Sequence, residues 1–282
     1  MARLADIHAS IGNMNELQGI VSAMRSLAGM RMQEAQRALP GVRRYAGSIV
    51  EGIASLMPRA DGSGLPVGPQ TGRRAVILLA SEHGFAGGFN ERLLETLQGQ
   101  LKPDDELLVL GSRGVALVRE RIRKPAWTYP MATRTGAVAD LINRLSAELY
   151  RGIASRDIAR VEVISARFTE GSNSLIECRA VLPLDPTSLE GAPRREPPLH
   201  NLTVSALQER LLAEYVSALL TEAVVESIAS ENAARFAAME SAHQNVSKKL
   251  DDLRQQARLM RQAEITSELL ELATGAAALA GP

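Results

Sequence analysis

The chain lacks glycine and proline over most of its last third: neither residue occurs between Leu199 and Thr274. These are the two residues that most often end a helix. At a rise of about 1.5 Å per residue, one helix over this range would be about 110 Å long. A domain of this size is only about 35–45 Å across. We therefore expect the helix to extend beyond its own domain, as a shaft or lever would, and to transmit force or position to another molecule.

Several other features are scarce, and each absence excludes a class of protein. The only cysteine is Cys178, so the chain can form no internal disulfide, which fits a reducing compartment. Lysine and arginine together number 32, as do aspartate and glutamate, so no excess charge indicates nucleic acid or a membrane surface. The longest apolar run, Ala75 to Ala80, is too short to cross a bilayer, and we expect no signal peptide. With 45% apolar and 3% aromatic residues, the composition suits a soluble protein with coiled-coil packing.

Both ends of the chain contain heptad rows of mostly apolar residues. Near the C-terminus the rows are Met239, Val246, Leu253 and Met260, and His243, Leu250, Ala257 and Glu264. Near the N-terminus they are Ile7, Met14, Val21, Ala28 and Ala35, and Leu4, Ile11, Gln18, Arg25, Met32 and Leu39. Such rows are typical of coiled coils, so the two together predict a long antiparallel coiled coil between the N- and C-terminal helices. The N-terminal helix taken alone is also compatible with an ordinary amphipathic helix of a bundle.

The middle of the chain alternates between expected strands and expected helices. Glycine and proline from Asp61 to Gly72 indicate a linker after an N-terminal helix that ends near Pro58. The expected strands are Ala75–Ala80, Glu106–Leu110, Ile158–Phe168 and Ser174–Leu182, and the expected helices are Asn90–Leu101, Ser112–Arg121 and Gly136–Ile153. A hairpin turn from Thr169 to Asn173 would join the last two strands. This order predicts a central Rossmann-like α/β domain with a largely parallel sheet, and domain limits of 1–58, 73–198 and 199–282.

No segment has the pattern of an enzyme site. Ser81 to Asn90 follows a strand and precedes a helix, where a phosphate-binding loop would lie. It lacks the G-x-G-x-x-G spacing and a lysine followed by serine or threonine, so a tight turn with positive φ at its glycines is the simpler interpretation. His83 has no second histidine nearby in the sequence, which leaves a metal site without support. We expect no catalytic residue, no cofactor, no metal and no nucleic-acid site.

Short motifs in the chain resemble those of the F-type ATP synthase gamma subunit. Ser227 to Met239 (SIASENAARFAAM) is similar to that family's S-x-A-S-E-x-A-A-R-x-x-A-M. Arg261 to Leu269 (RQAEITSEL), followed by Gly275 to Ala278, resembles the family's C-terminal motif. Ser81 to Asn90 (SEHGFAGGFN) is similar to its S-D-R-G-L-C-G-G-L-N, and Gln18 to Met24 (QGIVSAM) is similar to its Q-K-I-T-K-A-M. The motifs keep the family's order and cover both ends and the middle of the chain.

The resemblance implies a central rotor shaft. In this family the coiled coil enters a catalytic head of alternating alpha and beta subunits, and the α/β domain forms a foot that sits with the epsilon subunit on the membrane-embedded ring of c subunits. The shaft is peripheral to the cytoplasmic face of the cell's inner membrane and has no membrane span and no catalytic residue. The resemblance also implies that partner subunits are contacted by Met24, Arg25, Glu231, Arg235, Arg261, Gln262 and Thr266. In the alternative interpretation, Arg25 and Arg261 are solvated charges beside the seam.

The chain departs from the family at several motif positions. Gly19 and Ser22 stand where the family has lysines, and Ala86 stands where its glycine turn has a cysteine. The segment from His200 to Leu202 aligns with an acidic family segment, Y-E-P, that is thought to meet the c ring. These changes indicate a divergent synthase, whose coupling ion is chosen by other subunits. Two other functions remain open: a coiled-coil scaffold with no rotary role, and a nucleotide-binding enzyme that uses the turn at Gly84.

Overall fold

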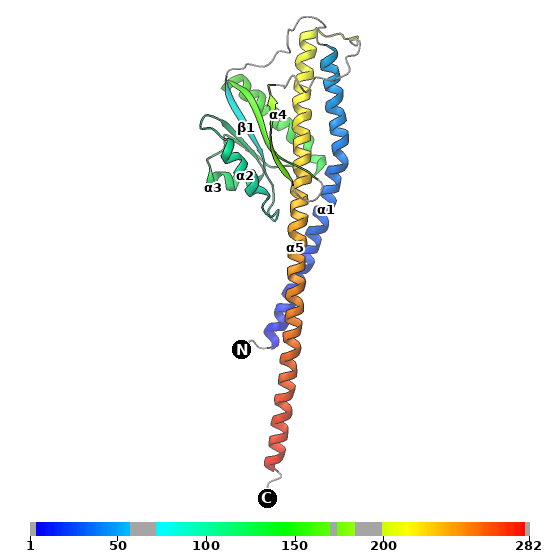
Figure 1. The fold of residues 1–282 in the computed structure, drawn as a ribbon, viewed down its shortest axis with the longest axis vertical. Helices are drawn as coiled ribbons and strands as arrows, with labels where there is room; N and C mark the ends of the chain where they lie inside the picture. Colours follow the sequence, from blue (N-terminus) through cyan, green and yellow to red (C-terminus); the bar gives the residue numbers. More distant parts are fainter. Residues whose placement is uncertain (1–3, 57–71, 170–173, 184–198, 280–282) are drawn as a thin grey trace. The chain divides into compact units, whose positions relative to one another are not determined.

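The structure is a computed structural model that describes residues 4–56, 72–169, 174–183 and 199–279 (Figure 1). Its helices and strands are, in chain order, α1 (Leu4–Ser55), β1 (Arg73–Leu79), α2 (Phe89–Gln100), β2 (Glu106–Leu110), α3 (Ser112–Arg121), β3 (Trp127–Tyr129), the 3-10 turn η1 (Thr135–Ala137), α4 (Val138–Arg156), β4 (Ile158–Arg167), β5 (Leu175–Leu182) and α5 (Val204–Leu279). Contacts group the residues into two units, 1–27 with 237–282, and 28–236. Both α1 and α5 contribute a part to each unit.

In the first unit, α1 and α5 pack against each other along an apolar seam. The side chains of this seam are Leu4, Ile7, Ile11, Met14, Leu253, Ala257 and Met260. Further along α1, Gln18 Nε2 donates a hydrogen bond to Ser247 Oγ at 2.9 Å, and Arg25 Nη1 pairs with Glu240 Oε2 at 2.6 Å. Residues later in α1 contact residues earlier in α5, so the two helices are antiparallel. The heptad rows therefore predict the pairing of the two helices correctly.

In the second unit, the same two helices pack together over a longer apolar contact. Ala35 and Leu39 of α1 are buried in one cluster with Val216, Leu220 and Val224 of α5. A separate cluster contains Ala46, Ile49 and Ile53 of α1 with Tyr215, Ala218 and Leu219 of α5. The helix α1 continues through Pro40 and ends at Ser55, whereas Pro58, near which the sequence predicts its end, lies outside the described residues.

The sheet of the second unit confirms the predicted α/β architecture. Its strand order is β3-β2-β1-β4-β5. The strand β1 is parallel to both β2 and β4, β2 is parallel to β3, and β5 is antiparallel to β4. All of β2 and most of β1 are buried, which is typical of parallel strands that have helices on both faces.

Alternate residues of β1 face two different apolar clusters. Val76 and Leu78 belong to the cluster that includes the buried residues of α2 and α3. Ala75, Ile77 and Leu79 belong to the cluster that includes α4 together with parts of α1 and α5. Figure 1 shows α2 and α3 on one side of β1 and α4 on the other. Because successive side chains of a strand point to opposite faces, β1 packs against helices on both sides of the sheet.

The structure differs from the sequence prediction at a few places. The edge strand β3, Trp127–Tyr129, is not predicted, because it has only three residues and lies between Pro125 and Pro130. Its pairing with β2 holds it in place, and within the strand the Trp127 and Tyr129 rings stack with centroids 5.6 Å apart. The turn expected at 169–173 lies mostly outside the described residues. Among the described helices, none is both long and apolar enough to cross a membrane.

Candidate functional site

The segment Ser81–Asn90 forms a turn that is closed on itself. The Ser81 N–H donates to Asn90 Oδ1 at 3.1 Å, and Asn90 Nδ2 donates to Ser81 Oγ at 2.7 Å, with both residues buried. As predicted, a glycine adopts positive φ here, Gly87 at 56°. Phe85 also does so, at 63°, and its side chain is 69% exposed. A bulky residue in this region is uncommon, so the turn holds an apolar ring out to solvent at some conformational cost.

The carboxylate of Glu82 ties this turn to two other loops at the same edge of the sheet. It accepts hydrogen bonds from the Ser112 N–H at 3.0 Å, the Ser112 hydroxyl at 2.6 Å and the Met131 N–H at 2.8 Å. Burial alone would raise the pKa of Glu82, but these hydrogen bonds outweigh it and lower the pKa. The carboxylate thus lies at the N-terminus of α3, where the unpaired N–H groups of the helix favour a negative charge.

Two serines of α5 attach the helix to the end of β4. The Ala166 N–H donates to Ser227 Oγ at 3.4 Å, and the Ser230 hydroxyl donates to the Ala166 carbonyl at 3.0 Å. Both serines are almost completely buried. Because each hydroxyl meets a backbone group of the sheet, these contacts fix both the position and the rotation of α5 about its own axis.

Arg235 connects α5 to the turn after β1. Its guanidinium donates to the carbonyls of His83 and Gly84, both at 3.3 Å, and to Asn232 Oδ1 at 3.2 Å. It also pairs with Glu231 at 2.5 Å, and both side chains are less than a tenth exposed. Burial raises the pKa of Glu231, and the charge of Arg235 opposes that rise. The two motifs at 81–90 and 227–239, which are far apart in the sequence, therefore form one site.

The residues predicted to contact partners fall into different environments. Glu231 and Arg235 are buried within the chain, so their partner contact stays a prediction and their described role is to position the turn. Arg25 is partly exposed and paired with Glu240, and Met24 beside it is half-buried. The other three, Arg261, Gln262 and Thr266, are exposed. The structure does not bring Arg25 and Arg261 together, because Arg25 pairs with Glu240 much earlier along α5.

The end of α5 has no partner among the described residues. Every residue from 261 to 274 is exposed. Ile265, Leu269 and Leu272 are 50%, 61% and 70% exposed, and their spacing places them on one side of the helix. The end of α5 therefore presents an exposed apolar stripe to its surroundings.

The described residues offer no alternative chemical centre. Among them, no group of histidine, cysteine, aspartate and glutamate could hold a metal ion. The Cys178 thiol lies beside Glu162, with Sγ 3.4 Å from its Oε2. Burial, with the hydrogen bond and charge of Glu162, raises the pKa of Cys178 to about 11, so this thiol is a poor nucleophile.

Comparison with known proteins identifies the family. A family model described as ATP synthase matches residues 3–279. A protein named ATP synthase gamma chain from Geobacter sp. (strain M21) is 28% identical over 292 residues, which cover 100% of both chains. The gamma chain of Chlorobaculum tepidum is 27% identical, with 99% of each chain covered.

Solved structures have the same fold. A chain of the Euglena gracilis mitochondrial ATP synthase, in a structure of OSCP, F1 and c ring, has a TM-score of 0.67 at 14% identity, covering 98% of this chain and 94% of that one. A chain from the central stalk and c ring of the Tetrahymena thermophila mitochondrial ATP synthase has a TM-score of 0.56 at 18% identity, covering 79% and 99%. At these identities the structures show the fold alone. Because the family model spans nearly all of the sequence, the chain belongs to the ATP synthase family, and the curated relatives that it matches are gamma chains.

Proposed function

We propose that the chain is the central rotor shaft of an F-type ATP synthase, which couples rotation of the c ring to ATP synthesis or hydrolysis in the alpha/beta head. The observation that carries this proposal is the contrast within α5. Ser227, Ser230 and Arg235 attach the helix to the α/β domain, whereas residues 261–274 are wholly exposed and carry an apolar stripe. A helix fixed in one region and uncovered in another is suited to transmit rotation to a surrounding partner.

The shaft is proposed to act without catalytic residues of its own. In the turn at 81–90, polar side chains are engaged within the chain: Glu82 accepts hydrogen bonds from Ser112 and Met131, and Asn90 closes the turn on Ser81. Catalysis then belongs to the head, and the shaft biases it. Each orientation of the shaft must differ in its contact energy with a given beta subunit, because otherwise rotation could not shift that subunit between conformations.

The proposed contacts with the head lie on two exposed surfaces. On α1, Leu17, Ile20 and Leu27 are 40%, 58% and 43% exposed and share one side of the helix with Met24. Met24 and Arg25 would face the beta subunit there. On α5, Arg261, Gln262 and Thr266 would face the upper part of the head, where a guanidinium can donate two parallel hydrogen bonds to a carboxylate. The foot would meet epsilon and the c ring at the cytoplasmic face of the inner membrane.

Co-purification tests the proposal. A tagged chain, expressed with its native operon, is expected to bring down alpha, beta and epsilon, with fewer copies of the chain than of alpha or beta. The purified single chain is expected to bind no nucleotide and to hydrolyse none, once contamination by the head is excluded. Saturable nucleotide turnover by the single chain would instead support an enzyme that uses the turn at Gly84. Recovery without any synthase subunit would support a scaffold.

A further inference from the structure

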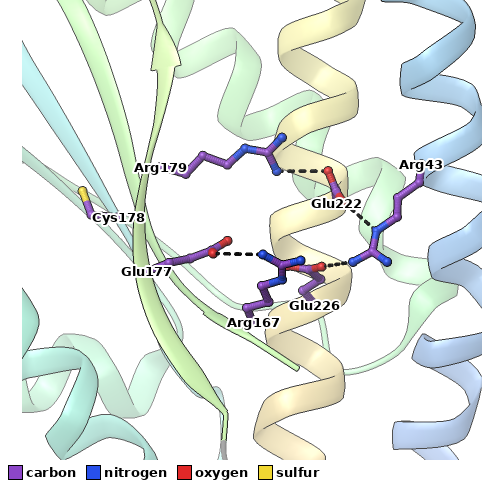
Figure 2. Close-up of a pocket in the computed structure, with 7 residues that line it drawn as sticks. All are labelled: Arg43, Arg167, Glu177, Cys178, Arg179, Glu222 and Glu226. Carbon is purple, nitrogen blue, oxygen red and sulfur yellow. Dashed lines mark hydrogen bonds and ion pairs between the residues drawn. The ribbon is translucent and has the colours of Figure 1, made fainter. Parts of the chain in front are cut away.

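A cluster of charged side chains surrounds a hollow of about 380 Å³, whose lining also includes Cys178 (Figure 2). Its charged members are Arg43, Arg167, Glu177, Arg179, Glu222 and Glu226. They come from α1, β4, β5 and α5. The positive and negative side chains are equal in number and are mostly paired with one another, so the hollow has no surplus charge to attract a free ion.

Arg43 of α1 is the centre of this cluster. Its Nε donates to Glu222 Oε1 at 2.8 Å, and its Nη2 donates to Glu226 Oε1. Arg179 of β5 donates to the other oxygen of Glu222 at 3.0 Å. Glu222 therefore receives guanidinium groups from α1 and from β5, and three elements are joined through one carboxylate, as Figure 2 shows.

The two carboxylates that pair with Arg43 are largely buried from solvent, whereas Arg43 itself is about half exposed. The side chains of Glu222 and Glu226 are 13% and 4% exposed, and that of Arg43 is 48% exposed. Burial tends to raise the pKa of Glu222, but hydrogen bonds from Arg43 and Arg179 outweigh it and lower the pKa. Glu222 thus keeps its charge at neutral pH, and its bond to Arg43 is charge-assisted.

The backbone of α1 is weakened next to this cluster. Pro40 lies inside the helix, has no N–H, and so leaves the carbonyl of Gln36 without its usual helical partner. Gly41, which follows, is a poor helix former. From Pro40 to Tyr45 no side chain is buried, although Leu39 before this stretch and Ala46 after it are both buried against α5. Two side chains of this stretch bond to α5: Arg43 pairs with Glu222 and Glu226, and the exposed Tyr45 hydroxyl donates to Glu214. Of the two, only Arg43 bonds to buried carboxylates and, through Glu222, reaches the sheet.

We propose that Arg43 is a positioning residue for rotary coupling: it holds α1 to α5, and through Glu222 to β5, where Pro40 and Gly41 weaken the helix. The inference rests on the proposed function and names a place where torque passes between the helices and the sheet. Lysine cannot replace this arginine fully, because an ammonium group is a single point of charge and does not match two carboxylates with the geometry of a guanidinium.

The test uses the complete synthase in membrane vesicles, with the variants Arg43→Ala, Arg43→Lys and Pro40→Ala/Arg43→Ala. Arg44→Ala is the matched control, since Arg44 is exposed and has no ion pair among the described residues. The first measurement is the rate of ATP synthesis driven by an imposed ion gradient, divided by the rate of ATP hydrolysis in the same vesicles. The second is hydrogen exchange of the α1 amides between Gly41 and Ala46 in the purified complex.

We expect Arg43→Ala to lower the ratio of ATP synthesis to ATP hydrolysis by about threefold, which is the size expected from losing a partly exposed ion pair. The same variant should speed exchange of the amides between Gly41 and Ala46. For Arg43→Lys, both the ratio of synthesis to hydrolysis and the exchange rate should lie between those of Arg43→Ala and the unaltered chain. Arg44→Ala should change neither quantity. Adding Pro40→Ala to Arg43→Ala should restore part of the lost ratio. An assembled Arg43→Ala complex with an unchanged ratio, with or without faster exchange, would overturn the inference. If Arg43→Ala does not assemble, the same criterion applies to Arg43→Lys. Failure of the unaltered chain to assemble with alpha and beta would refute the proposed function instead.

Discussion

Two stretches of α5 show how little hydropathy alone says about burial. Residues 223–233 are all buried, yet they include Glu226, Ser227, Ser230, Glu231 and Asn232. Residues 261–274 are all exposed, yet they include large apolar side chains. In the first stretch the fold supplies each polar group with a partner, so polar residues can be buried. In the second stretch none of the described residues covers the helix, and the apolar residues remain available to another molecule.

The polar groups of the buried stretch are satisfied one by one. Ser227 and Ser230 bond to the backbone of Ala166, and Asn232 Nδ2 donates to the Ile228 carbonyl at 2.8 Å. Such a group would cost about 1–3 kcal/mol if its partner were removed. Variants in this stretch should therefore act on stability, and variants in the exposed end should act on function.

The largest expected effect comes from breaking the buried ion pair. Arg235→Ala leaves the buried Glu231 carboxyl without its partner and removes the hydrogen bonds to the His83 and Gly84 carbonyls, and we expect a loss of about 3–5 kcal/mol in the free energy of unfolding. The midpoint of urea unfolding of the purified chain measures it. Arg254→Ala, at an exposed arginine 3.7 Å from Asp251, is the control and should change little. Equal stability of the two variants would contradict the assignment of Arg235 as a buried anchor.

A smaller effect is expected at the seam of the first unit. Leu253→Ala removes a side chain that is 8% exposed and packs with Ile7, and we expect it to cost about 2 kcal/mol. Leu259→Ala is a matched control on the same helix, since Leu259 is 58% exposed. Thermal unfolding followed by circular dichroism should show a lower midpoint for the seam variant alone. If both variants melt alike, α1 and α5 do not pair there in solution.

The third effect depends on pH and concerns Glu82. Because the folded-state pKa of Glu82 is lowered, its carboxylate stabilises the fold at pH values above the unfolded pKa, and this stabilisation is lost as the pH falls through the folded pKa. Glu82→Gln should therefore be less stable than the unaltered chain at pH 7, by less than about 1 kcal/mol since the group is partly solvated. The difference should shrink between neutral pH and pH values below the usual range of glutamate. A difference that stays constant with pH would mean that the charge of Glu82 has no part in it.

The smallest effect on stability is expected at the exposed end. Arg261→Ala/Gln262→Ala should change the free energy of unfolding by no more than about 0.5 kcal/mol, because neither side chain is buried. The same double variant should lower ATP synthesis by the assembled complex, since it removes groups proposed to contact the head. Unchanged ATP synthesis in a fully assembled complex would count against these residues as partner contacts.

Periodic features of the fold could be predicted from the sequence. The heptad rows identify Ile7 and Leu253 as seam residues, and both are buried. The run of apolar residues at Ala75 identifies the central strand. Each depends on a pattern within a short stretch of sequence, a heptad repeat in one case and a continuous apolar run in the other, so neither needs knowledge of what packs against it. The short strand β3 has no such repeat, because its three residues lie between prolines and are ordered by pairing with β2.

The candidate site could be predicted only in pieces. The sequence singles out Glu231 and Arg235 on one side and the glycine turn on the other, but not that Arg235 bonds to the carbonyls of His83 and Gly84. That contact joins groups more than a hundred residues apart through backbone atoms, which have no signature in the side-chain sequence. The sequence does not predict the ion pairs of Arg43 either, because Glu222 and Glu226 are more than a hundred residues away along the chain. A basic residue close after an intrahelical proline is the one local signal that could have indicated them.

The single, weakly acidic thiol of this chain is an advantage for fluorescence labelling. At neutral pH almost none of the Cys178 side chain is thiolate, because its pKa is raised to about 11. Maleimide dyes react with the thiolate, so the native residue should label slowly. A cysteine introduced at the exposed position Thr266 would then carry nearly all of the dye, and fluorescence polarisation could follow the angle of the end of α5 without any background substitution.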